Sequence, residues 1–439
     1  MIKNIHDSLK QTLLNLYNKI FLKCDFPPRW RLAIVIPIQK PNKDSTDPNN
    51  YRPISLTNCM CKIIERIINN RLVSYLESRN LFSPYQSGFR HNRSSTDNLM
   101  ILDSAIHSAI EKKQHSIAIF FDLTKAYDTA WKYNILKQLH SFGMRGNLPL
   151  FIKEFLTDRK IQVRVGNTLS PEKSVEEGIP QGSVLSCTCF AIAINNICEE
   201  LPNNVSKCLY VDDFALFASG SSTNTIERRL QLAINKLETW CHKTGFQFST
   251  VKTASLHICR KKTCPKTAAN LKLNGTPINN VSSFKYLGMT YDNSFTWRPH
   301  ITKLKASCNK TIDLLKHLSH KKWGADRKSL LSLYIMLIKP KIDYGIETYA
   351  STAKTYKNSI NAIQNSAIRI ATGAFKSSPI TSLHAESGIK PYKYFSDIKH
   401  LNYLIRVSAN PSHPLHQKYT EYTENPNLSR TKELCLQYA

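Results

Sequence analysis

Two adjacent aspartates, Asp212 and Asp213, lie inside the otherwise apolar stretch LYVDDFALF, residues 209–217. Burying neighbouring carboxylates is unfavourable unless a positive charge compensates them. The flanking segments read as two short strands, so we expect the pair at the turn of a hairpin, with both side chains at one edge. Aspartate is also common in ordinary surface turns, and the pair alone does not distinguish the two interpretations.

A third carboxylate, Asp122, follows the apolar run 117–121, which has the length of a buried strand. An aspartate in this position could simply cap a following helix. Carboxylates at the ends of two adjacent strands, however, form a hard oxygen site for Mg²⁺, and the cation removes their repulsion. Two such ions about 4 Å apart support phosphoryl transfer. The three acids together therefore predict a metal-dependent site that acts on phosphate esters.

The composition favours a polyanionic partner. The 439 residues include 60 Lys and Arg against 32 Asp and Glu, a formal charge of +28. Such an excess is self-repelling unless nucleic acid or another polyanion binds, although a merely soluble basic protein remains the simpler alternative. No apolar run approaches the roughly 20 residues of a membrane span, and the amphipathic N-terminus does not resemble a secretory signal. We expect no membrane association and an intracellular, non-secreted protein, in the nucleus or the cytoplasm.

The 12 cysteines do not form a recognisable metal motif. The pairs in CMC, 59–61, and CTC, 187–189, are too close together for a tetrahedral zinc knuckle. Cys259 and Cys264 lack a second pair of ligands in the sequence. Without a signal peptide, we expect reduced intracellular thiols that pack as small hydrophobic groups.

Hydrophobic periodicity predicts the elements that would position the acids. We expect the strand 117–121 to pass into a helix, a hairpin to turn at Gly166–Asn167, and another to turn at Asn274–Gly275. After Trp297 the pattern becomes helical and basic, which divides the chain into an α+β part and a helical part. The longer predicted helices cover residues 97–112, 225–243, 301–320, 326–338, 354–372 and 392–408.

Five segments occur in the order of motifs A to E of reverse transcriptases: FFDLTKAYD, EEGIPQGSVLS, LYVDDFALF, TVKT and FKYLGM. With the segments IPIQKPNKDSTDPNNYRPISL and LFSPYQSGFRHNRSSTDNL, the chain resembles non-LTR (LINE-type, jockey-like) retrotransposon reverse transcriptases over residues 5–415. The resemblance implies an α+β right-hand polymerase fold. Fingers and palm, with an antiparallel palm sheet, would occupy 1–297, a basic helical thumb and post-polymerase region 298–410, and a loosely ordered tail 411–439.

The same resemblance implies RNA-directed DNA polymerase activity with an RNA template, a DNA primer, deoxynucleoside triphosphates and two Mg²⁺ ions. Asp122 and Asp212 would be the principal metal ligands, assisted by the carbonyl of Leu123, and Asp213 would be a less direct third carboxylate. Lys252 in TVKT corresponds to a possible general acid for pyrophosphate departure. The simpler alternative for Lys252 is an exposed surface lysine.

Other positions of the resemblance concern the incoming nucleotide. Tyr127 would be an aromatic gate that leaves no room for a 2′-hydroxyl, or else a residue packed on the core. Gln181 and Gly182, in GIPQGS, would let the backbone and an amide approach the nascent base pair. Lys40 and Arg52 would hold the triphosphate, with Lys43 as a rival to Lys40 and exposed lysines as the alternative. The lysine-bearing helix 301–320 would follow the template–primer duplex through phosphate contacts that depend on salt.

The sequence departs from the family pattern at Val211, Cys187 and Ser249, where Ala, Pro and Asn are more usual. These departures leave the metal ligands intact but keep open a catalytically decayed, nucleic-acid-binding remnant. An RNA polymerase is a further alternative, although such enzymes usually have an acid near position 127. We expect neither an endonuclease domain before the polymerase nor an RNase H domain after it in this chain.

Overall fold

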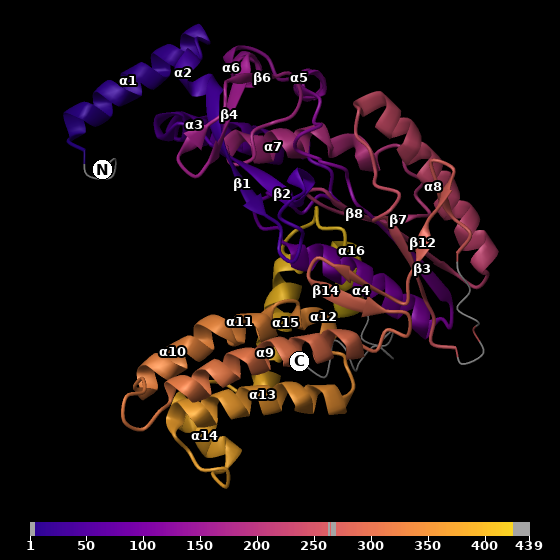
Figure 1. Cartoon of the computed structure of the whole chain (residues 1–439). Helices are drawn as coiled ribbons and strands as arrows, with labels where there is room; N and C mark the ends of the chain where they lie inside the picture. Colours follow the sequence, from indigo (N-terminus) through magenta and orange to yellow (C-terminus); the bar gives the residue numbers. More distant parts are fainter. Residues whose placement is uncertain (1–4, 262–263, 265–268, 425–439) are drawn as a thin grey trace.

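The computed structural model describes residues 5–261, 264 and 269–424 (Figure 1). Its helices are α1 Asp7–Lys23, α2 Pro28–Arg31, η2 Pro48–Asn50, α3 Cys59–Ser78, α4 Ser95–Glu111, α5 Lys132–Ser141, α6 Asn147–Leu156, α7 Val184–Ala193, η3 Asn195–Cys198, α8 Thr223–Thr244, α9 Arg298–Leu318, α10 Arg327–Leu337, α11 Lys339–Asp343, α12 Ile346–Tyr349, α13 Lys354–Thr372, α14 Ile380–Ser387, α15 Tyr392–Ser408 and α16 His416–Glu424. Its strands are β1 Leu32–Gln39, β2 Tyr51–Leu56, β3 His115–Phe121, β4 Arg159–Val165, β5 Thr168–Leu169, β6 Lys173–Val175, β7 Ser206–Tyr210, β8 Asp213–Gly220, β9 Ala254–Ile258, β10 Lys272–Leu273, β11 Thr276–Pro277, β12 Asn279–Asn280, β13 Ser283–Tyr286 and β14 Met289–Asp292. The expected α+β fold is confirmed.

The central sheet has the strand order β12-β9-β3-β8-β7, so β3 lies in its middle. Strand β3 runs antiparallel to both β8 and β9, and β7 and β8 form the expected hairpin. Alternate side chains of β3 enter two different cores. Ile117 and Ile119 pack with helix α8, whereas Ala118 and Phe120 pack with helix α4. Because both faces are covered, the strand reads as a continuous apolar run rather than an alternating one.

A second sheet has the order β2-β1-β4-β5, with β6 paired to β4. Strand β1 is antiparallel to β2 and parallel to β4, and β4 and β5 form the hairpin expected at Gly166–Asn167. Helix α7 runs from this sheet toward the central one in Figure 1, and α3 packs against α7. Helices α1 and α2 form the indigo end of the molecule.

Helices α9 to α15, which are orange and yellow in Figure 1, gather beneath helix α4. The expected apolar stripe of α9 is confirmed, with Ile301, Leu304, Cys308, Ile312 and Leu315 all buried. Its lysines lie on the opposite, exposed face: Lys303, Lys305, Lys310 and Lys316. The helix therefore uses one face for packing and presents a basic face to solvent.

Asp97 joins the chain near the central sheet to the C-terminal helices. Its side chain is fully buried, completes a capping box with Ser94, and accepts hydrogen bonds from Arg406 at 2.6 Å and His413 at 3.1 Å. Burial alone would raise the pKa of this carboxyl. The hydrogen bonds from His413 and Ser94 and the charge of Arg406 outweigh burial and lower the pKa below its usual value, so the carboxyl stays ionised.

Two expectations about elements were wrong. Residues 124–129 form turns rather than a helix after β3, because Lys125 has a left-handed backbone conformation, with φ of 49°, that interrupts a helix. The tail expected to be loose is ordered over 411–424, where it forms α16 and buries Leu415 and Tyr419. The remainder of that tail, 425–439, lies outside the described residues.

Among the described helices, none combines the length and the apolar character that crossing a bilayer requires.

Candidate active site

Two neighbouring strands of the central sheet bring the three acids together. Phe121 at the end of β3 pairs with Phe214 of β8, so Asp122 continues directly beside Asp213. Asp212 occupies the turn just before β8. Antiparallel partners are about 5 Å apart between Cα atoms, and the three carboxylates lie close enough to repel one another electrostatically.

The turn that carries Asp212 is strained and is held from outside. Val211 adopts a left-handed conformation with φ of 59°, which a β-branched residue avoids. Its amide donates to Oε1 of the fully buried Gln86 at 3.0 Å. Gly88 packs against it so closely that a Cβ there would lie 2.4 Å from the Val211 side chain. Gln86 and Gly88 therefore fix the turn, although nothing in the sequence of their segment indicates this role.

The acids differ in their surroundings. Solvent reaches Asp212 and Asp213, yet the protein atoms packed around them raise the pKa of both carboxyls, and neighbouring acids add to this effect. For Asp213, burial followed by the charges of Asp212 and Asp122 raises the pKa to about 6. A crowded set of carboxylates with raised pKa values is a site that a bound cation would stabilise.

Asp122 already has a cationic partner. Lys252 donates to its Oδ2 at 3.0 Å, and the amide of Ser249 donates to its carbonyl at 2.8 Å. The Asp122 side chain is 41% exposed and the Lys252 side chain 66% exposed, so this ion pair contributes less than about 1 kcal/mol. Another cation can therefore readily replace Lys252 beside Asp122. Leu123, whose carbonyl is an expected ligand, is buried. It forms an isolated antiparallel β-bridge with Phe248, the residue before Ser249.

Tyr127 lies on the inner wall of the site. Its ring stacks on Phe190 of α7, with centroids 4.6 Å apart and an angle of 14° between planes. Burial raises the pKa of its hydroxyl, and the nearby Cys187 and Asp212 raise it further. The tyrosine is therefore a neutral, rigid aromatic group close to Asp212.

The GIPQGS loop needs both of its glycines. Gly178 and Gly182 have φ of 78° and 125°, and a Cβ on either would lie 2.6 Å from a backbone oxygen, that of Asp128 and Ser55 respectively. The Gln181 side-chain amide donates to the Asp128 carboxylate at 2.9 Å, and the backbone carbonyl of Gln181 accepts from the Ser55 amide at 2.7 Å. The loop is thereby attached to strand β2 and to the segment after β3, and it lines a cavity of about 310 Å³ against β1, β2 and β4.

Glu65 of α3 anchors the helix that follows this loop. It is fully buried and accepts hydrogen bonds from the Ser183 hydroxyl and from the amides of Val184 at 2.8 Å and Leu185 at 3.3 Å. A carboxylate on the first amides of a helix satisfies orphan donors and complements the helix dipole. The sequence reasoning missed Glu65, whose only signal is one acid within the apolar stripe KIIERII.

The expected triphosphate cations lie on the β1–β2 hairpin. Lys40 donates its Nζ to the carbonyl of Asn49 at 2.9 Å, whereas Lys43 and Arg52 are exposed. Over residues 5–261, 264 and 269–424, no hydrogen bond or ion pair joins these three cations to the acids. Arg52 does lie on the strand that reaches the Gly182 loop through Ser55.

Comparison with known proteins adds to this geometry. A sequence model described as reverse transcriptase (RNA-dependent DNA polymerase) matches residues 38–291. A probable RNA-directed DNA polymerase from transposon BS of Drosophila melanogaster is 30% identical over 363 residues, covering 81% of this chain and 40% of that protein. The RNA-directed DNA polymerase from mobile element jockey of the same organism is 27% identical over 380 residues, covering 85% of this chain and 41% of that protein. The chain thus spans about two fifths of the length of these curated relatives.

Among solved structures, an apo telomerase from Candida Tropicalis is similar with a TM-score of 0.45 and 11% identity, covering 98% of this chain and 73% of that chain.

Replacing Glu65 by alanine is expected to lower the free energy of unfolding by about 2–3 kcal/mol, because three buried donors lose a charged acceptor. Urea unfolding measures this change, with Glu111→Ala, at the exposed end of α4, as the matched control. Equal stability of the two variants would contradict the anchoring role.

Replacing Asp213 by asparagine is expected to stabilise the metal-free fold at pH 7.5, because it removes a charge that its neighbours repel. The pKa is raised in the folded state, so wild-type stability falls as pH rises from about 4 to about 6 and stays reduced above that range. Because solvent screens this carboxyl, we expect a gain of about 1 kcal/mol rather than the roughly 3 kcal/mol of the full shift.

Urea unfolding in EDTA tests this pH dependence. Wild type and Asp213→Asn should be equally stable at pH 3.5 and differ at pH 7.5, and the exposed Asp7→Asn should show no difference. An Asp213→Asn protein less stable than wild type at pH 7.5 would show that the cluster is not repulsive.

Proposed function

The chain belongs to the reverse transcriptase family, since the family model spans residues 38–291, and from this membership we propose that it is the RNA-directed DNA polymerase of a non-LTR retrotransposon. It adds deoxynucleotides to the 3′-hydroxyl of a DNA primer on an RNA template. The observation that carries the proposal is the meeting of Asp122, Asp212 and Asp213 at one edge of the central sheet.

We propose that these acids hold two Mg²⁺ ions, with Asp122 and Asp212 as principal ligands, the Leu123 carbonyl assisting and Asp213 less direct. The repulsion among the three acids and the raised pKa values of Asp212 and Asp213 support this assignment. The chemistry that such ions supply when bound is a lowered pKa of the attacking hydroxyl and stabilisation of the leaving oxygen. Below about pH 6, protonation of Asp213 removes one negative charge from the site.

The remaining roles belong to the chain's own side chains. Lys252, whose Nζ lies 3.0 Å from Asp122 Oδ2, would be the general acid that protonates the leaving pyrophosphate. Gln181 and Gly182 would let the loop backbone and the Gln181 amide approach the nascent base pair. Arg52 and Lys40 bind the triphosphate from the β1–β2 hairpin as fork and point charge respectively.

The exposed lysines of α9 support a thumb that follows the template–primer duplex through its phosphates. We infer the division into fingers and palm, 1–297, and thumb with post-polymerase helices, 298–410, from the start of α9 at Arg298. The residues after 410 continue that helical region as far as α16. The same proposal includes an intracellular location, an RNA template and deoxynucleotide substrates.

Replacing Asp212 by asparagine is expected to reduce primer extension on an RNA template by about 10³-fold or more, roughly 4 kcal/mol in the barrier, because a metal ligand is lost. Extension by the purified chain with Mg²⁺ measures the effect. The control Asp7→Asn changes an aspartate that is 90% exposed on α1. A wild-type chain that binds primed RNA without extending it would instead identify a decayed binding remnant.

Replacing Tyr127 by alanine is expected to raise the incorporation of ribonucleotides relative to deoxynucleotides by about 10-fold or more, roughly 1.4 kcal/mol, because the ring that excludes a 2′-hydroxyl is removed. Single-nucleotide extension with each nucleotide type measures the ratio. The exposed Tyr133 gives the matched control, Tyr133→Ala. Unchanged sugar selectivity would leave Tyr127 as a core residue, and efficient ribonucleotide use by the wild type would indicate an RNA polymerase.

A further inference from the structure

A second group of chemically reactive side chains lies at the opposite end of β3 from the acids. His115 is the first residue of β3, and Cys259 directly follows β9. The register pairs Ser116 with Ile258 and Ile117 with His257, so Cys259 comes opposite His115. Because side chains alternate along strands, His115, His257 and Cys259 project from the same face of the sheet.

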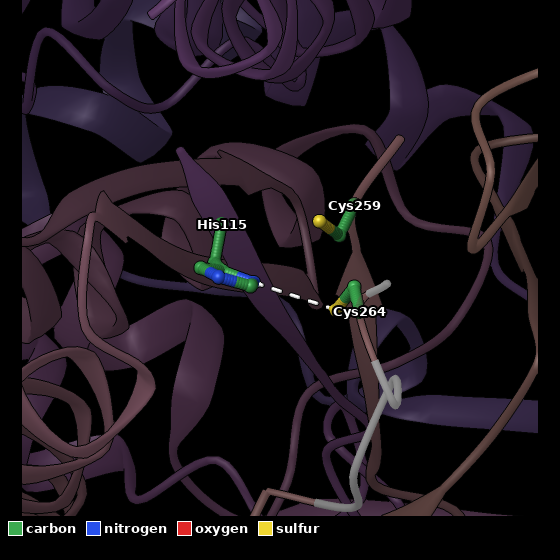
Figure 2. A group of neighbouring side chains, drawn as sticks. All are labelled: His115, Cys259 and Cys264. Carbon is green, nitrogen blue, oxygen red and sulfur yellow. Dashed lines mark hydrogen bonds between the residues drawn. The ribbon is translucent and has the colours of Figure 1, made fainter. Parts of the chain in front are cut away.

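Cys264 also belongs to this group. Its amide donates to the carbonyl of Lys261 at 3.2 Å. Figure 2 shows the His115 ring directed at the Cys264 sulfur, with the Cys259 sulfur beside them. The potential ligand atoms of His115, Cys259 and Cys264 all lie within 4.8 Å of one another.

The distances fit a tetrahedral metal site. Ordinary Zn–S and Zn–N bonds place a sulfur and a nitrogen ligand about 3.6 Å apart, and Cys264 Sγ lies 3.7 Å from His115 Nδ1. His257 Nε2 lies 3.0 Å from the same nitrogen, against about 3.3 Å for two nitrogens on one zinc. His257 lies outside the group of three whose ligand atoms are all within 4.8 Å of one another, so its ring must turn toward the two sulfurs to become the fourth ligand.

We propose that Cys259, Cys264, His115 and His257 bind one Zn²⁺ ion. Two sulfurs and two imidazoles are a donor set that selects zinc among common divalent ions, and four protein ligands make a closed, structural site. On binding, each thiol releases its proton to solvent, so that two thiolates neutralise the ion and the site carries no net charge. Burial raises the pKa of the Cys259 thiol and the nearby Lys261 only partly offsets this, so the bound ion itself has to favour the thiolate form.

The site is distinct from the acids. His115 and Asp122 are separated by the whole of β3, about 23 Å at 3.3 Å per residue. A disulfide between Cys259 and Cys264 is the rival interpretation, and the mass of the isolated chain distinguishes it from a metal site.

Metal analysis of the full chain, purified from cells grown with zinc and dialysed against metal-free buffer, tests the site directly. We expect about one zinc per chain for the wild type, and loss of that zinc in Cys259→Ser/Cys264→Ser and in His115→Asn. The exposed residues Cys59 and His242 give the matched controls Cys59→Ser and His242→Asn, which should retain it. Equal zinc content in all of these proteins would overturn the proposal.

Cobalt substitution of the wild type provides a readout that does not depend on whether a variant folds. Co²⁺ bound by two thiolates and two imidazoles should show thiolate charge-transfer bands and the strong visible bands of a tetrahedral ion, at about one equivalent. Absence of these bands in a folded wild-type chain would refute the site. So would a mass two hydrogens lighter, with Cys259 and Cys264 joined, in protein isolated under conditions that block thiol exchange.

Discussion

Electrostatic repulsion among the carboxylates at the end of β3 and β8 is the constraint around which the central sheet is built. Bringing Asp122, Asp212 and Asp213 together opposes folding, so other interactions must hold them there. The strands achieve this because each is buried on both faces, and a one-residue slip would exchange the side chains that face α8 and α4. The same packing that stabilises the fold therefore also maintains a locally unfavourable site.

Around the acids, the chain adopts conformations that only neighbouring elements make tolerable. Val211 is held in a left-handed conformation by Gln86, and the glycines of the GIPQGS loop approach the backbone of other segments more closely than any side chain permits. Glu65 fixes the helix after that loop from the far side of the core. Strained residues that persist in this way are concentrated where a precise geometry is required.

The sequence was sufficient for features that depend on local periodicity, and insufficient for those that depend on distant partners. The helices over 354–372 and 392–408 and the hairpin around Asp212 follow from apolar spacing and turn residues, and they agree with the structure. The pairing of Lys252 with Asp122 joins residues 130 positions apart, so no pattern within either segment contains it. Cys259 and Cys264 could not be assigned a histidine ligand from β3 for the same reason, since His115 lies 149 positions before Cys264. His257, in contrast, lies only two residues before Cys259.

The two ends of β9 link these observations. Lys252 lies just before the strand and Cys259 directly after it, while the strand itself pairs with β3 from Phe120↔Ala254 to Ser116↔Ile258. The reach of Lys252 to Asp122 therefore depends on the register of β9 against β3. A shift by one residue would move Cys259 to the opposite face of the sheet, away from His115. A metal joining those two residues would oppose such a shift, and it would thereby hold in place the lysine at the other end of the same strand.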